Sequence, residues 1–151
     1  MNIIKITVDV GGKNYTFRPK EMLGIKGKHI AKELFTHSNT LFFWARLRDK
    51  ANALYRAELD ELYRMKSQSM VNVMEHLESK HSFCDSKIAT AHVEVDPDVI
   101  NQKKYVNDLH ADKDVLESIV TAIKERGRVL VALRYSERFP EQINTQNDEK
   151  D

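Results

Sequence analysis

The spacing of apolar residues along the chain predicts a β-hairpin followed by long helices. From Ile4 to Val10 every second residue is apolar, which is typical of a half-buried strand. Gly11 and Gly12 come next, and a second β-rich run at residues 15–17 follows them. Two such runs around a Gly-Gly pair predict a hairpin whose turn needs positive φ angles. Because a lone hairpin is marginal in water, we expect it to dock on another element.

Beyond Pro19 the apolar positions take on helical spacing. A short helical segment is expected at residues 29–35, and Ser38 or Thr40 is expected to cap the next helix. That helix runs for about ten turns without Gly or Pro. Because its apolar stripe is so long, we expect it to face another helix. The stripe consists of Trp44, Leu47, Ala51, Leu54, Tyr55, Leu59, Leu62, Met70, Val73 and Leu77.

The second half of the chain predicts an extended segment and a second long helix. Alternating apolar residues over Ile88–Val95 indicate a short strand. Asp96 and Pro97 then form a strong helix start, with Asp96 as the N-cap and Pro97 at the first helical position. From there to Phe139 the pattern is helical. Gly127 stands within the apolar stripe, where its missing side chain permits another helix to approach closely.

These elements define a mainly α protein, with an N-terminal β-hairpin plus two long amphipathic helices that form a helical, oligomerising core. The expected parts are a basic hairpin and short helix (1–37), the helical core (38–139) and an acidic disordered tail (140–151). Two long stripes are covered only by folding back or by contact with other copies, so we expect a homo-oligomer. Its expected interface residues are Trp44, Leu47, Leu54, Leu62, Val120, Ile123, Gly127 and Leu130.

Composition adds little to this interpretation. Of the 151 residues, 41% are hydrophobic and 31% charged, which suits solvated helices better than a thick core. The longest stretch without charged residues, 34–45, is too short for a membrane span of about 20 residues, and we recognise no secretory signal. The single cysteine, Cys84, excludes an intramolecular disulfide and fits a reducing compartment. We therefore expect a cytoplasmic protein.

Charge is unevenly distributed, although 24 Lys and Arg nearly balance 23 Asp and Glu. Residues 1–32 hold seven Lys or Arg against two acids, a formal charge of +5. Residues 136–151 hold five acids against two basic residues, a formal charge of −3. A basic front and an acidic tail suggest that one end meets a polyanion or an acidic surface. A solvated basic face without a partner is the alternative.

The sequence shows no motif for catalysis or for a cofactor. It has no phosphate-binding loop and no dinucleotide fingerprint. His76, His81, Cys84, Asp85 and His92 match no zinc spacing, and the cysteine has no CxxC partner. We therefore expect neither an enzyme nor a metal site, and no cofactor. The Lys and Arg residues of the long helices could instead contact phosphates, with neighbouring aromatic rings stacking on unpaired bases.

Several features occur in the order found in a known family. An aromatic pair beside Trp44 opens a charged helix, and Lys87–Val95 forms the link that follows it. Asp96-Pro97-Asp98-Val99 then starts the last helix, which contains Ala122-Ile123-Lys124-Glu125-Arg126-Gly127. Over residues 41–139 this order resembles UvsY, the recombination mediator family of T-even-like phages. Residues 3–32 have no counterpart that we recognise in that family.

The resemblance implies a small, non-catalytic helical protein that assembles into a ring-like homo-oligomer. Such a protein binds single-stranded DNA, displaces or remodels the single-strand-binding protein and loads a RecA-like recombinase. It would serve DNA recombination, repair and replication in the host bacterial cytoplasm if the chain is phage-encoded. Single-strand binding would then lie in the core, 38–139. The candidate phosphate contacts are Arg64, Lys66, Lys124, Arg126 and Arg128.

The alternative hypothesis is a coiled-coil structural or assembly protein of a phage with no nucleic-acid role. In that case the hairpin or the acidic tail would recruit a protein partner. Salt-sensitive binding to single strands separates the two hypotheses, because a scaffold should show little of it.

Overall fold

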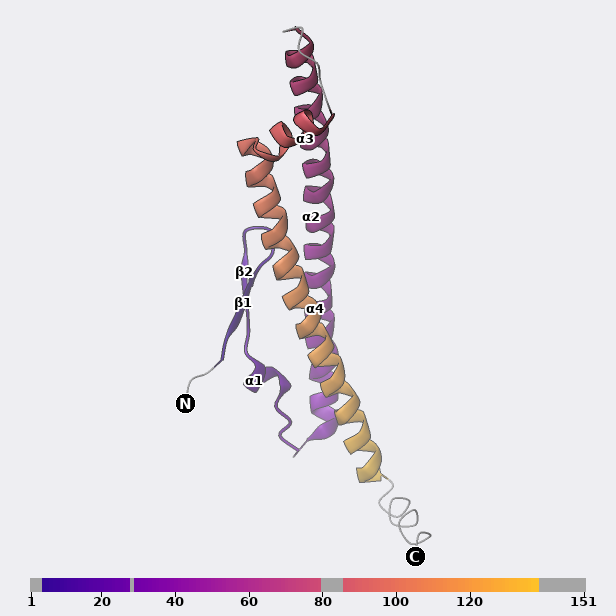
Figure 1. The fold of residues 1–151 in the computed structure, drawn as a ribbon. Helices are drawn as coiled ribbons and strands as arrows, with labels where there is room; N and C mark the ends of the chain where they lie inside the picture. Colours follow the sequence, from indigo (N-terminus) through magenta and orange to yellow (C-terminus); the bar gives the residue numbers. More distant parts are fainter. Residues whose placement is uncertain (1–3, 28, 80–85, 139–151) are drawn as a thin grey trace, which may run out of the picture. The chain divides into compact units, whose positions relative to one another are not determined.

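The computed structural model describes residues 4–27, 29–79 and 86–138 and consists of long helices and one small sheet (Figure 1). This confirms the predicted mainly α fold with an N-terminal β-hairpin. None of the helices in the described ranges is both long and apolar enough to span a bilayer. In chain order the elements are β1 (Ile6–Asp9), β2 (Asn14–Phe17), α1 (Pro19–Leu23), α2 (Ile30–Ser79), α3 (Ser86–Glu94) and α4 (Pro97–Arg138).

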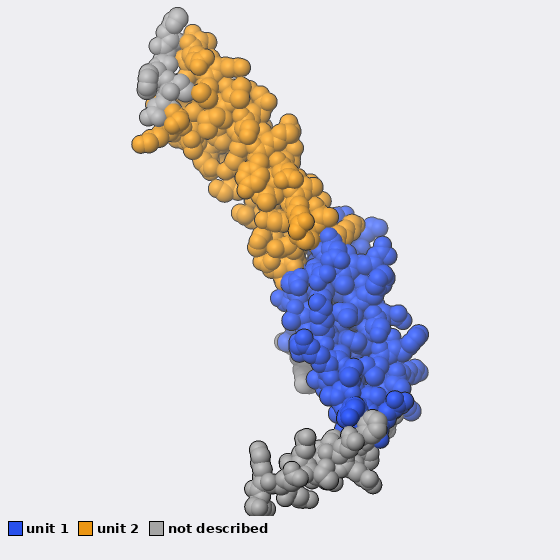
Figure 2. All heavy atoms as spheres, turned by 90° about the vertical axis from the view of Figure 1, so that its right-hand side faces the viewer, with its two compact units in different colours: residues 1–49, 115–151 blue, residues 50–114 orange. Residues whose placement is uncertain are grey.

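The chain divides into two compact units, which Figure 2 shows in different colours. Unit 1 comprises residues 1–49 and 115–151, and unit 2 comprises residues 50–114. Unit 1 therefore contains the hairpin, α1, the beginning of α2 and the second part of α4. Unit 2 contains the rest of α2, all of α3 and the beginning of α4.

The predicted hairpin and its glycine turn are confirmed. β1 and β2 pair antiparallel, with Ile6 opposite Phe17. Gly11 and Gly12 have φ angles of 64° and 78°, a conformation that a residue with a Cβ rarely adopts. The amide of Gly12 donates a hydrogen bond to Oδ1 of Asp9 at 3.0 Å, which closes the turn.

The hairpin docks on α2 within unit 1, as expected for a sheet of two strands. Val8, Val10 and Phe17 are buried. The ring of Phe17 meets that of Trp44 edge to face, with ring centroids 5.3 Å apart. Such a pair adds about 0.5–1.5 kcal/mol to the effect of burial. The helix thus provides the apolar surface that a lone hairpin lacks.

α2 begins earlier than the sequence predicted, and the helix expected at residues 29–35 is its first part. Ser38 and Thr40 do not cap a new helix. Their hydroxyls, and that of Thr36, donate instead to carbonyls four residues earlier in the same helix. The boundary expected between residues 37 and 38 therefore falls inside α2.

The strand expected over Ile88–Val95 is wrong, because these residues belong mainly to α3. Ala89 and Val93, four residues apart, are buried, whereas Ile88 and Val95 are exposed. This is the burial pattern of a helix with one covered face. The alternation misled because two of its positions are alanines, which favour a helix at least as strongly as any other residue.

The predicted start of α4 is confirmed. Pro97 is the first helical residue, and Oδ1 of Asp96 accepts the backbone amide of Asp98 at 3.0 Å. The hydroxyl of Ser69 on α2 donates to Oδ2 of Asp96 at 2.7 Å. This bond, followed by the bond from the Asp98 amide, lowers the pKa of Asp96. In unit 2 the cap therefore also joins α4 to α2.

Most residues expected at a subunit interface form the core of a single chain. The α2 and α4 segments of each unit cover one another, so these side chains do not need a second copy to be buried. This corrects the assignment of the buried residues to a subunit interface. A homo-oligomer stays a prediction, and its subunits would have to meet through other residues. Leu54 and Gly127 are half-buried. The fully buried members of the set are Trp44, Leu47, Leu62, Val120, Ile123 and Leu130.

We expect Asp96→Ala to lower the melting temperature clearly, because the first turn of α4 loses its cap and Ser69 loses its acceptor. Asp96→Asn should cost less, since asparagine keeps an acceptor for the Asp98 amide. Thermal unfolding followed by circular dichroism measures both effects. Asp98→Ala, which removes a neighbouring exposed acid, is the control. Equal losses for Asp96→Ala and Asp98→Ala would contradict a capping role.

Candidate functional site

Charge is divided between the two units. The described residues of unit 1 (4–27, 29–49 and 115–138) hold 13 Lys and Arg against 7 Asp and Glu, a formal charge of +6. Those of unit 2 (50–79 and 86–114) hold 8 against 11, a formal charge of −3. The near-neutral total of the chain conceals this division. A polyanion is therefore attracted to unit 1.

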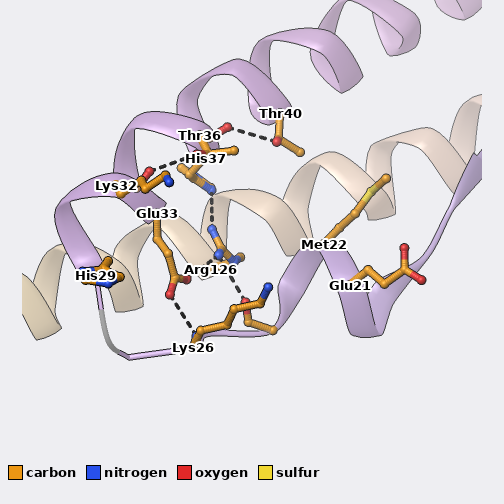
Figure 3. Close-up of a pocket in the computed structure, with 11 residues that line it drawn as sticks. Glu21, Met22, Lys26, His29, Lys32, Glu33, Thr36, His37, Thr40 and Arg126 are labelled. Carbon is orange, nitrogen blue, oxygen red and sulfur yellow. Dashed lines mark hydrogen bonds and ion pairs between the residues drawn. The ribbon is translucent and has the colours of Figure 1, made fainter.

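Three neighbouring hollows on unit 1 share cationic lining residues. The central pocket, shown in Figure 3, has a volume of about 510 Å³ and lies where the segment before α2 meets α2 and α4. A second hollow of about 450 Å³ shares Lys26 with it. A third hollow, of about 500 Å³, shares His29 and Lys32 with it. Besides Arg126 and His37, five basic residues line these hollows, and we define them as the basic track: the lysines and arginine Lys20, Lys26, Lys32 and Arg134, together with His29.

Most of the charge on the basic track is not neutralised. Arg134 forms an ion pair with Glu137 at 3.0 Å, but the other four side chains make no ion pair with any residue that the structure describes. All four are exposed. Of the two acids that line the central pocket, Glu21 is paired with Arg18 at 3.3 Å, and Glu33 is paired with Arg126 and mostly covered. An incoming anion therefore meets free cations rather than free carboxylates.

The central pocket is held in place by a buried ion pair. Nη2 of Arg126, on α4, lies 2.8 Å from Oε2 of Glu33, on α2, and the two side chains are only 11% and 14% exposed. Nη2 also donates to the carbonyl of Gly24 at 3.2 Å, and Oε1 of Glu33 accepts the backbone amide of Lys26 at 2.9 Å. The pair thus joins the segment before α2 to both helices (Figure 3). Removing one partner of such a pair costs about 3–5 kcal/mol.

His37 and Gly127 complete this cluster. Nδ1 of His37 lies 3.4 Å from Nη1 of Arg126, and a Cβ on Gly127 would overlap the His37 ring. Burial, and then the charge of Arg126, lower the pKa of His37 from its ordinary value of 6.5. The close approach predicted at Gly127 is therefore confirmed. It is made by α2 of the same chain, which corrects the assignment of Gly127 to a subunit interface.

Two of the predicted phosphate contacts lie on unit 2 and are paired with acids. Arg64 is exposed and forms an ion pair with Glu61, one turn away. Nζ of Lys66 lies 2.8 Å from a carboxylate oxygen of Glu94. The hydrogen bond from Lys66 is the largest of the causes that lower the pKa of Glu94. Phosphate binding at either cation would have to compete with these partners.

The other three predicted contacts lie on α4 in unit 1. Lys124 and Arg128 are exposed, but neither lines the three hollows. For both, phosphate contact stays a prediction. Arg126 lines the central pocket, but its guanidinium is mostly covered and paired with Glu33, so a phosphate there would have to compete with this partner and phosphate contact stays a prediction.

Sequence reasoning left the basic track out of the candidate site. Four of its five residues lie within the first 32 residues, and the formal charge of +5 there is the signal that points to them. That segment lies outside the family resemblance, which covers residues 41–139. The fifth, Arg134, is brought to the track only by the fold.

Unit 1 also has exposed aromatic rings, although none of them lines the three hollows. Phe35, one turn after Lys32 on α2, is 75% exposed, and Tyr135, next to Arg134 on α4, is 56% exposed. Phe42 is 65% exposed and lies 5.8 Å from the guanidinium of Arg46. Stacking of an unpaired base on such a ring contributes about 1–3 kcal/mol. Cations and rings together suit an anionic polymer that carries flat, unpaired groups.

Comparison with known proteins gives no family for this chain: no protein-family model, no curated protein and no solved structure matches it. Within the described ranges, no group of three or more His, Cys, Asp or Glu could hold a metal ion. His81, Cys84 and Asp85 lie outside those ranges. The described part of unit 1 thus carries an exposed basic surface with three adjoining hollows.

We expect Gly127→Ala to destabilise the protein by about 1–3 kcal/mol, because the added Cβ overlaps the His37 ring. In a His37→Ala background the overlap is gone, and the same change should be neutral or stabilise by up to about 1 kcal/mol through helix propensity. Urea unfolding of the four variants measures this coupling. The same cost in both backgrounds would show that His37 does not impose the glycine.

Stability should decrease as the pH falls below about 6.5, the ordinary pKa of histidine. With the pKa of His37 lowered by burial and by Arg126, the unfolded chain binds the proton more readily, so acid favours unfolding. Above that pH both states are neutral and the effect disappears. His37→Gln should flatten the dependence between about pH 7.5 and 5.5 in urea unfolding. The exposed His92→Gln is the control, and an unchanged slope in His37→Gln would contradict the assignment.

Proposed function

We propose that this protein binds single-stranded DNA through the basic track of unit 1 and acts as a recombination mediator. The observation that carries the binding is the series of three hollows lined by the unpaired lysines Lys20, Lys26 and Lys32, on a unit that also has exposed aromatic rings. The mediator role adds the resemblance of residues 41–139 to the UvsY family. The proposal includes no catalytic step.

The electrostatics of the track favour an anionic polymer over a single anion. Each phosphate that a lysine or arginine neutralises releases condensed counterions, so affinity accumulates along a strand and falls with salt. The free cations are spread over three adjoining hollows rather than gathered at one point. A strand that follows the hollows would place successive phosphates near successive cations.

The exposed rings supply a reason to prefer single strands. The ring of Phe35 is 75% exposed, and a base can stack on such a ring only when the base is unpaired. In a duplex those faces of the bases are already covered. We therefore propose that duplex DNA competes poorly for this surface.

A mediator has to hold the strand and then release it. Many weak contacts permit this, because they break one at a time, and repetition of the track in a homo-oligomer would restore the overall affinity. The proposed partners are single-stranded DNA, the single-strand-binding protein that is displaced and a RecA-like recombinase that is loaded. The proposed oligomer would use surfaces other than the buried stripes of α2 and α4.

We expect the double variant Lys26→Gln, Lys32→Gln to bind labelled oligo-dT more weakly than the unmodified protein. At about 0.7 per phosphate contact, the salt slope of log K should fall by about 1.4 for two lost contacts. Fluorescence anisotropy between about 50 and 200 mM salt, with duplex as competitor, measures this slope. The matched control is Lys50→Gln, Lys104→Gln, two exposed lysines of unit 2 that make no ion pair among the described residues.

The control should keep the slope of the unmodified protein. If both double variants lose the same slope, binding follows net charge and not the basic track. If the unmodified protein does not bind at low salt, the DNA proposal is wrong, and an assembly scaffold becomes the better interpretation.

A further inference from the structure

The acidic end of the sequence begins beside the basic track. α4 ends at Arg138, and residues 139–151 continue the chain from there. The third hollow is lined by Arg134 and Glu137, both in the final turns of α4. The segment therefore leaves the helix next to one end of the track. It carries four acids, Glu141, Asp148, Glu149 and Asp151, against Lys150, a formal charge of −3.

The segment is a chain of 13 residues that continues from the end of α4. At about 3.3–3.6 Å per residue, 13 residues reach at most roughly 45 Å. A short tether of this kind gives an effective concentration in the millimolar range. Weak ion pairs between its carboxylates and the lysines can therefore form often within one chain.

The charges on the two sides are complementary. The described part of unit 1 has a formal charge of +6, and the free side chains of Lys20, Lys26 and Lys32 lie along the track. The acids that line the central pocket are already paired, so they do not repel a carboxylate strongly. Unit 2, with a formal charge of −3 over its described residues, is the less favourable surface for the segment.

We propose that residues 139–151 of this chain occupy the basic track and compete there with the DNA strand. The competition rests on the proposed function of the track, whereas the occupancy itself does not. Each carboxylate has one charge and the segment has few, so a long strand displaces it. Salt screens the attraction, which makes the inhibition strongest at low ionic strength.

The competition is tested in the full-length chain by removing the four charges. The variant is Glu141→Gln, Asp148→Asn, Glu149→Gln, Asp151→Asn. The control is Asp60→Asn, Glu75→Gln, Glu78→Gln, Asp108→Asn, which changes the net charge equally at exposed acids of unit 2 that make no ion pair among the described residues. We expect the variant to bind oligo-dT about 3- to 10-fold more tightly at low salt, which corresponds to an effective concentration several times the dissociation constant of the segment for the track. The control should change affinity less than about 2-fold.

The occupancy is tested without DNA. A carbodiimide joins a carboxylate to a lysine that it touches, and mass spectrometry then identifies the joined peptides. We expect links from residues 139–151 to Lys20, Lys26 or Lys32. Mixing ordinary and ¹⁵N-labelled protein separates links within one chain from links between chains. Links only to lysines of unit 2, only between chains, or no links at all would overturn the proposal.

The two tests separate the two proposals. Links to the track in a protein that binds no DNA would leave the occupancy standing and contradict the proposed function. DNA binding that the charge variant does not tighten would leave the function standing and contradict the competition.

Discussion

The candidate site depends on the buried ion pair between Arg126 and Glu33. It fixes the short segment at residues 24–26 against two helices, and the central pocket exists only because that segment is held there. The ion pair also lies against two neighbouring residues, His37 and Gly127. Burial, and then the charge of Arg126, lower the pKa of His37, and a glycine at position 127 leaves room for the His37 ring. Gly127 thus stands in the interior of α4 despite the low helix propensity of glycine, because a side chain at this position would overlap the His37 ring.

A second consequence of this arrangement is electrostatic. Because Glu33 is neutralised by a buried arginine, the exposed cations around the pocket are not cancelled by its charge. The central pocket is lined by a free lysine from the segment before α2 and by another from the start of α2. In the adjoining third hollow, α4 contributes Arg134. Four of the 13 Lys and Arg residues in the described part of unit 1, three of them unpaired, therefore line one series of hollows as the basic track. The proposed strand binding and the proposed competition by residues 139–151 both follow from this track.

The parts of the fold that local chemistry determines could be predicted from the sequence. The Gly-Gly turn, the Asp96 cap and the long helices each have a signal within a few residues. α3 was mistaken for a strand because short Ala and Val runs satisfy both periodicities. The role of Arg126 could not be predicted, because Glu33 is 93 positions away and a charged motif on an amphipathic helix normally faces solvent. The basic track likewise needed the fold, which brings Arg134 to the segment at the beginning of the chain.

The most direct test of the central claim locates bound DNA on the chain. Oligo-dT containing 4-thiothymidine is photo-cross-linked to the full-length protein, and the modified peptides are identified by mass spectrometry. The account predicts adducts between residues 20 and 35 and around residues 134–135, with few in residues 50–114. Adducts concentrated around Arg64 and Lys66 would contradict it and would return the binding site to unit 2.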